Sequence, residues 1–516
     1  MKDEKINVLQ VGTTNWKREL TIPENIEWFY ISPQNVEMFS KTYRLQEAFK
    51  RRAIHAVLLT DDFYDESILS LGGLFEPYSL LYSTGIGPNS VSDSVRRFLI
   101  AQMAYPVSMD NPNELVDVLS HTFFEKQYGD KFHTKDLIVS TSFKGKIGFD
   151  GSAYLTLEGH FGEEFRQIAN YAYNIPKDEV PLEFWPEFIK EGPCELQYKL
   201  QIIPLGGTKI LSEIVVSEAE LNKPFYLRDK QEGYLHLSIF AKGEGKLKLG
   251  PTHYRFSRYH FGTLLLGGNV HATSKRQEFL HYLHPGDFTP PLNVYFSGYR
   301  TAEGFEGYWM MKSLNKPFLL IADPRLEGGS FYIGDQEYED AIKQVIQDAL
   351  DFLGFEASQM IMSGLSMGTY GALYYGLDFK PHAIVVGKPL VNLGKLAENE
   401  KTIRPNIFPT SLDLLKQYAN DLSEQSRQDL DNRFWTKFED ADLSHTQLRI
   451  AYMKNDDYDR TAFYDLLEKT RSSGTKLVGK GWVGRHNDNY GAITQWFISQ
   501  FRSLIRLDFS KEKHEQ

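Results

Sequence analysis

The sequence predicts an α/β protein in which an all-β region separates two α/β regions. Strand-like and helix-like segments alternate at both ends of the chain, whereas short segments of alternating apolar and polar residues fill its middle. The 516 residues also exceed what one ordinary core accommodates. We therefore expect three domains, over residues 1–132, 133–268 and 269–510.

The first region alternates apolar strand-like segments, such as NVLQVG and IHAVLLT, with helix-like segments such as VEMFSKTYRLQEAFKRR. This alternation is typical of a mainly parallel, Rossmann-like sheet. The first strand ends in VGTTNW, which has a single glycine where a dinucleotide fingerprint needs several. We therefore predict no nucleotide site there.

The second region contains segments of period-two alternation, including ELQYKLQIIP and YLHLSIFAKG, separated by glycine-rich turns. This pattern predicts a β-sandwich. Aromatic residues make up 14% of the chain, and most are expected in cores or sheets, although such a composition also suits stacking on sugars. We expect the sandwich to be carbohydrate-binding-like. Residues 162–193 do not follow the pattern and are expected to form a helical excursion or a flap.

The composition limits the partners and the compartment. A formal net charge of −11 argues against broad binding of nucleic acid or an anionic membrane. Cys194 is the only cysteine, which excludes an intrachain disulfide and a cysteine-rich zinc site and favours a reducing compartment. No apolar run approaches the roughly 18 residues that a spanning helix needs, and the N-terminus resembles a strand more than a signal sequence. We expect a cytoplasmic protein that reaches the membrane only through partners.

The third region returns to clear alternation. Its strand-like segments include LNVYFSG, FLLIAD, QMIMSG, HAIVVG, LRIAYM and KLVGKGW, and helix-like segments separate them. This pattern predicts a doubly wound α/β domain. Residues 394–443 interrupt the alternation and are expected to form a helical cap insertion.

The segment SGLSMG places Gly364, Ser366 and Gly368 in a G-x-S-x-G pattern between a strand and a helix. In such a turn the serine adopts an unfavourable backbone conformation, which requires small residues two positions before and after it. The hydroxyl then lies at a helix N-terminus, where the backbone N–H of Met367 can stabilise a negative oxygen. The pattern also occurs in plain strand-to-helix connections, so the rest of the site decides between the two interpretations.

A nucleophilic serine needs a base and a carboxylate that orients the base, in the order serine, acid, histidine for an α/β-hydrolase-like domain. The loop NDDYD, directly after the strand-like LRIAYM, supplies the acid candidates. We rank Asp456 first, Asp457 second and Asp459 third. The alternative is that these side chains cap the helix that begins near Thr461.

The base candidate is His486, in the loop between the last strand and the last helix. A loop histidine is usually only solvated, but its place after the acid loop favours a catalytic role. The second oxyanion donor is expected in the loop after LNVYF, at the backbone N–H of Gly298 or Tyr299. Arg300 either binds substrate or pairs with a surface carboxylate.

No metal site and no bound cofactor are predicted. His281 and His284, with His271 nearby, could line one helix face, but no third ligand type has metal-like spacing. The NDDYD loop lacks the glycine and the terminal glutamate of a calcium loop.

The N-terminal α/β region, a sandwich containing GEGKLKLGPTHYRFSRYHFG, and a terminal domain with SGLSMGTYGALYYG and GRHND together resemble the accessory Sec system proteins of the second Asp type. Here Asp abbreviates accessory secretory protein, and the family occurs in streptococci and staphylococci. The resemblance covers the whole chain. By position, Ser366 matches the family's nucleophile and His486 its base, while the acid falls in the NDDYD loop and need not be an aspartate.

The resemblance implies two roles. One is export of serine-rich-repeat glycoprotein adhesins, together with the first- and third-type Asp proteins and the accessory SecA motor. The other is serine-dependent carbohydrate O-acetyl transfer to N-acetylglucosamine on the adhesin glycan, with an acetyl donor, for which acetyl-CoA is the candidate, as a substrate. The alternatives are a non-catalytic scaffold or chaperone subunit of the export complex, and a free serine esterase.

Overall fold

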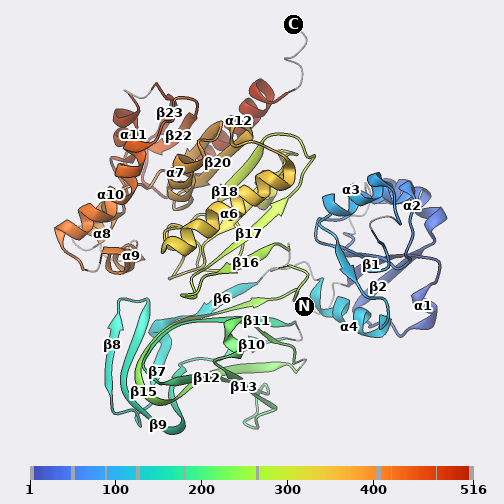
Figure 1. The fold of residues 1–516 in the computed structure, drawn as a ribbon, viewed down its shortest axis with the longest axis horizontal. Helices are drawn as coiled ribbons and strands as arrows, with labels where there is room; N and C mark the ends of the chain where they lie inside the picture. The colour runs from blue at the N-terminus through green and yellow to red at the C-terminus, as the bar shows by residue number, and fades with distance from the viewer. Residues whose placement is uncertain are drawn as a thin grey trace.

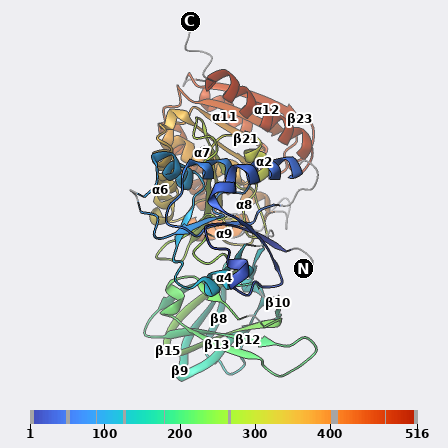
Figure 2. The same cartoon turned by 90° about the vertical axis from the view of Figure 1, so that its right-hand side faces the viewer.

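A computed structural model gives the arrangement of the three regions. The residues it describes are 5–47, 53–87, 90–123, 128–178, 180–229, 231–262, 267–400, 408, 410–419, 421–471 and 474–510. Figure 1 shows a blue N-terminal α/β region beside a yellow-to-red C-terminal α/β region, with a green β-sandwich below the latter. Figure 2 shows the N-terminal region from its own side, in front of the C-terminal region.

The N-terminal region is a parallel sheet flanked by helices. Its elements are β1 (Ile6–Val11), α1 (Trp16–Glu19), β2 (Ile26–Ile31), α2 (Val36–Glu47), β3 (Ala56–Leu59), β4 (Leu80–Ser83), α3 (Asp93–Ala101), β5 (Tyr105–Val107) and α4 (Pro112–Thr122). The strands pair in parallel in the order β2-β1-β3-β4-β5. Polar caps start the later helices, since the Ser92 side chain accepts the Val95 N–H and begins α3.

The middle region is an antiparallel β-sandwich built around two long strands. Its elements are β6 (Gly129–Phe132), β7 (Leu137–Val139), β8 (Lys146–Asp150), β9 (Tyr154–Tyr171), β10 (Ile175–Lys177), β11 (Leu182–Glu191), β12 (Glu195–Ile203), β13 (Ser212–Ser217), β14 (Phe225–Leu227) and β15 (Gly233–Phe256). Strand β15 pairs with β9, β11, β12 and β6. Strand β6 therefore belongs to this sheet, although its residues fall within the predicted first domain.

The expectation for residues 162–193 was wrong, because they form the end of β9 and all of β10 and β11. The register between β9 and β15 shifts at several points, and Gly159 and Gly162 on β9 have positive φ. Such bulges add residues to one strand and disrupt the alternation of buried and exposed side chains. The predicted strand TLLLGG lies largely outside the described residues.

The C-terminal region is a mostly parallel sheet covered on both faces. Its elements are β16 (Asn269–Ala272), β17 (Glu278–His284), β18 (Leu292–Phe296), α5 (Tyr308–Lys312), β19 (Phe318–Ala322), α6 (Gln336–Leu353), β20 (Met360–Leu365), α7 (Gly368–Phe379), β21 (Ala383–Gly387), α8 (Leu393–Glu398), α9 (Thr410–Ala419), α10 (Glu424–Asp440), β22 (Gln447–Met453), α11 (Ala462–Thr470), β23 (Lys476–Trp482) and α12 (Tyr490–Asp508). The order is β16-β17-β19-β18-β20-β21-β22-β23. Strands are antiparallel at β16–β17 and β17–β19 and parallel thereafter. This confirms the predicted α/β-hydrolase-like fold.

Two apolar cores lie on opposite faces of this sheet. One joins the strands to α6, α7 and the helices after β21, through residues such as Ile346 and Tyr375. The other joins them to α5 and α12, through residues such as Met311 and Phe501. The loops at the carboxyl ends of the parallel strands are therefore held between two packed layers, where ligands bind in such sheets.

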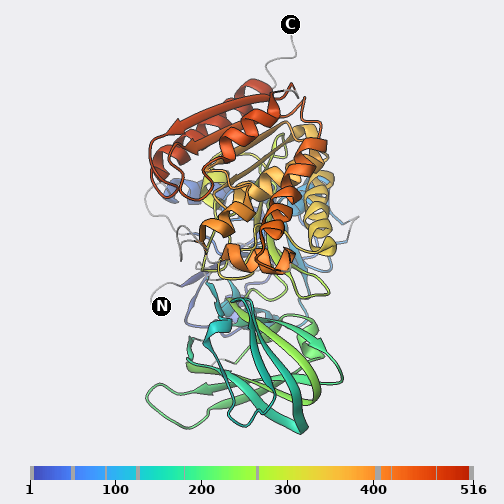
Figure 3. The same ribbon diagram turned by 90° about the vertical axis from the view of Figure 1, so that its left-hand side faces the viewer.

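Helices α8, α9 and α10 lie between β21 and β22, where the cap insertion is predicted, and parts of that segment lie outside the described residues. In Figure 3 these orange helices face the viewer, above the sandwich. The carboxylate of Asp413 on α9 accepts the backbone N–H of Ser152 at 2.8 Å. The cap therefore contacts the sandwich.

The N-terminal region contacts the C-terminal region through a short segment after Phe75. The Tyr78 hydroxyl donates to the Leu283 carbonyl at 2.8 Å, and the Tyr308 hydroxyl donates to the Glu76 carboxylate at 2.6 Å. Among the described helices, none combines the length and the apolar character needed to cross a membrane.

Candidate active site

The turn between β20 and α7 holds Ser366 in a left-handed backbone conformation, with φ of 53°. A Cβ at Gly364 would lie 2.2 Å from the Gly368 carbonyl oxygen, and one at Gly368 would lie 2.0 Å from the Phe296 carbonyl oxygen. Any larger residue would therefore push the strand and the helix apart. Glycine at positions 364 and 368 permits this sharp turn, and the turn presents the Ser366 hydroxyl above the sheet.

The structure brings the predicted serine, histidine and first-ranked acid together. Ser366 Oγ lies 2.7 Å from His486 Nε2, and His486 Nδ1 lies 2.9 Å from Asp456 Oδ2. His486 is 1% exposed and Asp456 is 6% exposed. In the tautomer whose Nδ1–H donates to Asp456, Nε2 can accept the serine proton.

The other two aspartates of the loop have different partners. Asp457 Oδ1 accepts the backbone N–H of His486 at 2.8 Å, so it holds the loop rather than the ring. Asp459 is buried and accepts the backbone N–H groups of Val391 and Asn392 at 2.9 and 2.8 Å. The three carboxylates therefore do separate tasks. The N-cap residue of α11 is Thr461, so none of the three aspartates occupies the capping position.

Two residues near the triad were missed by the sequence analysis. The ring of Tyr458 stacks on that of His486, with centroids 4.3 Å apart and an interplanar angle of 8°. The Lys388 ammonium donates to the Asp488 carbonyl at 2.9 Å and so holds the histidine loop. Burial lowers the pKa of Lys388, although the Asp456 and Asp488 carboxylates oppose the shift. Tyr458 could have been considered because it lies within the NDDYD loop, whereas no motif in the sequence indicates a role for Lys388.

The oxyanion donors divide into free and occupied groups. The Gly298 N–H donates to the Glu306 carboxylate at 2.6 Å, so it is not available to a substrate oxygen. This corrects the prediction for Gly298. The backbone N–H groups of Met367 and Tyr299 have no hydrogen-bond acceptor within the described part of the chain. These two groups have the chain positions expected of an oxyanion hole.

Aromatic rings connect the loops around the triad. The ring of Phe408, from the cap, lies 5.2 Å from that of Tyr299 and 6.0 Å from that of Tyr458. Arg300 points elsewhere: its guanidinium is 3.4 Å from the Phe305 carbonyl and 3.5 Å from that of Ala302. It therefore braces its own loop, and its role in substrate binding stays a prediction.

The three histidines considered for a metal lie on strands, so the predicted helix face was wrong. His271 is on β16, and His281 and His284 are on β17. Burial lowers the pKa of His281 and of His284 to about 4, which keeps both rings neutral. Within the described ranges, the residues that do have metal-like spacing are His253, Glu278 and Glu303.

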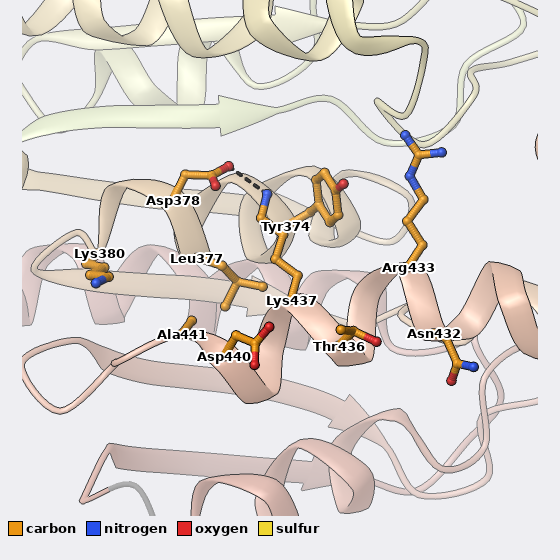
Figure 4. Close-up of a pocket in the computed structure, with 10 residues that line it drawn as sticks. All are labelled: Tyr374, Leu377, Asp378, Lys380, Asn432, Arg433, Thr436, Lys437, Asp440 and Ala441. Carbon is orange, nitrogen blue, oxygen red and sulfur yellow. Dashed lines mark hydrogen bonds and ion pairs between the residues drawn. The ribbon is translucent and has the colours of Figure 1, made fainter.

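A separate hollow lies between α7 and α10, with a volume of about 740 Å³. Figure 4 shows Lys437 and Asp378 paired on its wall, and their nitrogen and oxygen are 2.6 Å apart. Asp378 is near the C-terminal end of α7, whereas Ser366 precedes the N-terminal end, roughly 15 Å away along the helix axis. This hollow is not part of the triad's surroundings.

Known proteins match the chain along its full length. Residues 6–511 match the family model described as "Accessory Sec system GspB-transporter". A Streptococcus gordonii accessory Sec system protein of the second Asp type is 39% identical over 511 residues, covering 99% of both chains. The Staphylococcus aureus protein of the same type is 40% identical over 524 aligned positions, again covering 99% of both chains.

A solved structure has the same fold. A chain of the Glycosylation Associate Protein (Gap123) complex from Streptococcus agalactiae matches with 42% identity and a TM-score of 0.93, covering 98% of this chain and 99% of that one. The match extends through all three regions, so it supports the sequence resemblance independently of the active-site motif. The chain therefore belongs to the accessory Sec system proteins of the second Asp type.

Proposed function

We propose that the chain is a serine-dependent O-acetyltransferase that acetylates N-acetylglucosamine on a serine-rich-repeat glycoprotein adhesin before its export. The observation that carries this proposal is the continuous hydrogen-bonded path from Ser366 through His486 to Asp456, with Ser366 held in a strained turn. Such an arrangement suits acyl transfer through a covalent intermediate.

The first half-reaction forms an acetyl-serine. His486 Nε2 takes the Ser366 proton while Oγ attacks the acetyl carbonyl carbon of the donor. The N–H groups of Met367 and Tyr299 stabilise the resulting oxyanion. The bond to the leaving group then breaks, and His486 returns the proton to that group. With acetyl-CoA as the candidate donor, the leaving group is the thiol of coenzyme A.

The second half-reaction moves the acetyl group to a sugar. His486 takes the proton of a sugar hydroxyl, whose oxygen attacks the acetyl-serine carbonyl. The bond to Ser366 Oγ breaks, and the serine recovers the proton. Transfer instead of hydrolysis requires that sugar outcompete water. The rings of Tyr299, Phe408 and Tyr458 support this, because aromatic faces stack on sugars.

We also propose a second role, as a subunit of an export complex with the first- and third-type Asp proteins, the accessory SecA motor and the glycosylated adhesin. The match along the chain to a member of the Gap123 complex favours this role. In this proposal the protein is cytoplasmic and approaches the membrane only through the translocase.

The test is acetyl transfer in vitro. The protein is incubated with acetyl-CoA and a glycosylated adhesin fragment, and intact mass reports acetylation of the fragment. Ser366→Ala should abolish acetylation. Ser363→Ala is the matched control, because Ser363 is on the same strand and its hydroxyl donates to the Val294 carbonyl at 2.8 Å, away from His486.

Acetylation that survives Ser366→Ala would refute the catalytic proposal. Release of acetate without acetylated fragment would favour a serine esterase. If Ser366→Ala still assembles with its partners and supports export, the complex-forming role is separate from the chemistry.

A further inference from the structure

A buried cluster of charged side chains lies where the β-sandwich meets the C-terminal sheet. Each member is less than a tenth exposed. The sandwich contributes Lys131 on β6, Glu183 and Glu187 on β11, and His253 and Arg255 on β15, while the C-terminal region contributes Glu278 on β17 and Glu303 in the loop after β18. The junction thus pairs cations of the sandwich with carboxylates of the catalytic region.

The cluster is held by hydrogen bonds between the two regions. Arg255 donates from Nε to Glu303 and from both terminal nitrogens to Glu278. His253 lies between two carboxylates, with Nδ1 bonded to Glu303 and Nε2 to Glu187. Removing one partner of such a buried network is costly because the remaining charge stays buried.

The charges of His253 and Glu303 in this cluster are fixed near neutral pH. Burial lowers the pKa of His253, but the carboxylates of Glu303 and Glu278 outweigh it and raise the pKa to about 9. Burial raises the pKa of Glu303, but Arg255 and His253 outweigh it and hold the pKa at about 2. Near neutral pH the ring is a cation and Glu303 is a carboxylate.

Glu303 belongs to the same loop as the proposed oxyanion donor Tyr299. Its backbone N–H donates to the Gly129 carbonyl of β6 at 2.9 Å. A Cβ at Gly129 would lie 2.9 Å from the Cβ of Glu303, so the loop packs directly on the sandwich strand. The loop thus has its support in the sandwich.

The sandwich also holds the neighbouring loop after β19. The Lys131 ammonium donates to the carbonyls of Pro324 and Leu326, the latter at 2.8 Å. Two residues further, the Gly328 carbonyl accepts the N–H of Arg300 at 3.2 Å, next to Tyr299. Two independent contacts therefore lead from the sandwich to the backbone around Tyr299.

The spacing of His253, Glu278 and Glu303 within 4.8 Å would also suit a metal. However, Arg255 already donates to both of these carboxylates, and a cation there would face the guanidinium charge. The cluster is therefore better explained as an ion-pair network than as a metal site.

We infer that the β-sandwich positions the oxyanion hole: Glu303, held by Arg255 and His253, fixes the loop that presents the Tyr299 N–H beside Met367. Glu303 is a positioning residue, since it does not touch the reacting atoms. The inference rests on the proposed function in one respect, which is that Ser366 attacks an electrophile through an oxyanion-like state.

The test compares Glu303→Gln with Glu278→Gln in the full-length protein. Each change neutralises one buried carboxylate bonded to Arg255, but only Glu303 lies on the oxyanion loop. The readout is the rate at which a fluorophosphonate labels Ser366. In this reaction Oγ bonds to phosphorus, fluoride leaves, and the serine proton passes to His486, while the phosphoryl oxygen occupies the oxyanion hole. Thermal unfolding of both variants gives the matched measure of stability.

We expect Glu303→Gln to slow labelling on the order of tenfold to a hundredfold, because a small displacement of an oxyanion donor has large kinetic effects. Glu278→Gln should label within about threefold of the unchanged protein at a comparable loss of thermal stability. The inference is overturned if Glu303→Gln labels at the unchanged rate, or if both variants lose labelling in proportion to stability. It is also overturned if labelling persists in Ser366→Ala.

This readout separates the two claims. Labelling uses neither acetyl-CoA nor a glycan. A protein that fails to acetylate the adhesin fragment, yet loses Ser366 labelling through Glu303→Gln alone, would contradict the proposed function and leave the positioning role standing.

Discussion

Two buried histidines of this chain are each bonded to carboxylates, yet their surroundings give them opposite tasks. His486 has the Asp456 carboxylate at one ring nitrogen and the Ser366 hydroxyl at the other. His253 has carboxylates at both, from Glu303 and Glu187. A ring with one carboxylate keeps a nitrogen free to accept a proton, whereas a ring with two is held as a cation. The group bonded to the second ring nitrogen therefore decides whether a buried histidine can act as a base or serves as a fixed charge.

The largest expected difference is between His486→Gln and His253→Gln. His486→Gln removes the proposed base and should lower the rate of Ser366 acylation by at least about a thousandfold with little change in folding. His253→Gln leaves the base in place and should mainly lower stability, with a smaller kinetic effect through the Glu303 loop. Fluorophosphonate labelling and thermal unfolding measure the two effects. Equal kinetic losses in both variants would contradict the division of tasks.

The next largest effect concerns the carboxylate that orients the base. Asp456→Asn should slow acylation on the order of a thousandfold or more, because the amide no longer favours the required ring tautomer. Asp457→Asn is the control, since Asp457 accepts the backbone N–H of His486 at 2.8 Å, whereas the ring nitrogens bond to Asp456 and Ser366. We expect Asp457→Asn to slow acylation by about tenfold or less. A control as slow as Asp456→Asn would mean that the loop, and not the tautomer, limits the rate.

The stability of the junction should depend on pH through His253. Its pKa rises from 6.5 to about 9 on folding, so the folded protein binds this proton more tightly. That stabilisation is complete below about pH 6.5 and is lost as the pH rises through 9, with up to about 3 kcal/mol at stake. The carboxylates of Glu187, Glu278 and Glu303 face the ring. Lys131 and Arg255 in turn pair with Glu303.

Chemical denaturation at pH 6.5 and at pH 9 measures this dependence. His253→Gln should be less stable at pH 6.5 and should lose less stability than the unchanged protein between the two values. The same slope in both proteins would show that His253 does not carry the alkaline loss.

The smallest expected effect concerns the ring that lies on His486, the proposed base. Tyr458 stacks on His486 at 4.3 Å, and Tyr458→Leu should slow acylation by about threefold to tenfold by loosening the imidazole. Tyr458→Phe keeps the stack and should stay close to the unchanged rate. A large loss in the phenylalanine variant would instead implicate the hydroxyl.

The sequence was sufficient for the parts of the site that depend on local constraint. The glycines around Ser366 and the order of strands, acid loop and His486 follow from the α/β-hydrolase-like pattern, and Asp456 is the candidate nearest the strand. The oxyanion role of Gly298 could not be judged from the sequence. Its N–H donates to Glu306, eight residues later, and the order of strands and motifs does not reveal how that loop folds. The junction cluster joins residues from 131 to 303 and had no local signal at all.

The strands of the fold also differ in how well the sequence predicts them. Straight, continuously buried strands such as β20 were recognisable as apolar runs. Strands β9 to β11 were not, since bulges and positive-φ glycines break their alternation. Strand β6 joins the sandwich through pairing with a strand more than a hundred residues away, which no local segment indicates.

The most direct measurement of the central claim is the mass of the Ser366 peptide after rapid quenching. The protein is mixed with acetyl-CoA, with and without the glycosylated adhesin fragment, and the peptide is analysed for an acetyl group on Ser366. We predict an acetylated serine that accumulates without the fragment and disappears when the fragment is added, as acetylated glycan appears. An unmodified Ser366 during active transfer, or an acetyl-serine that decays equally fast in water alone, would contradict the account.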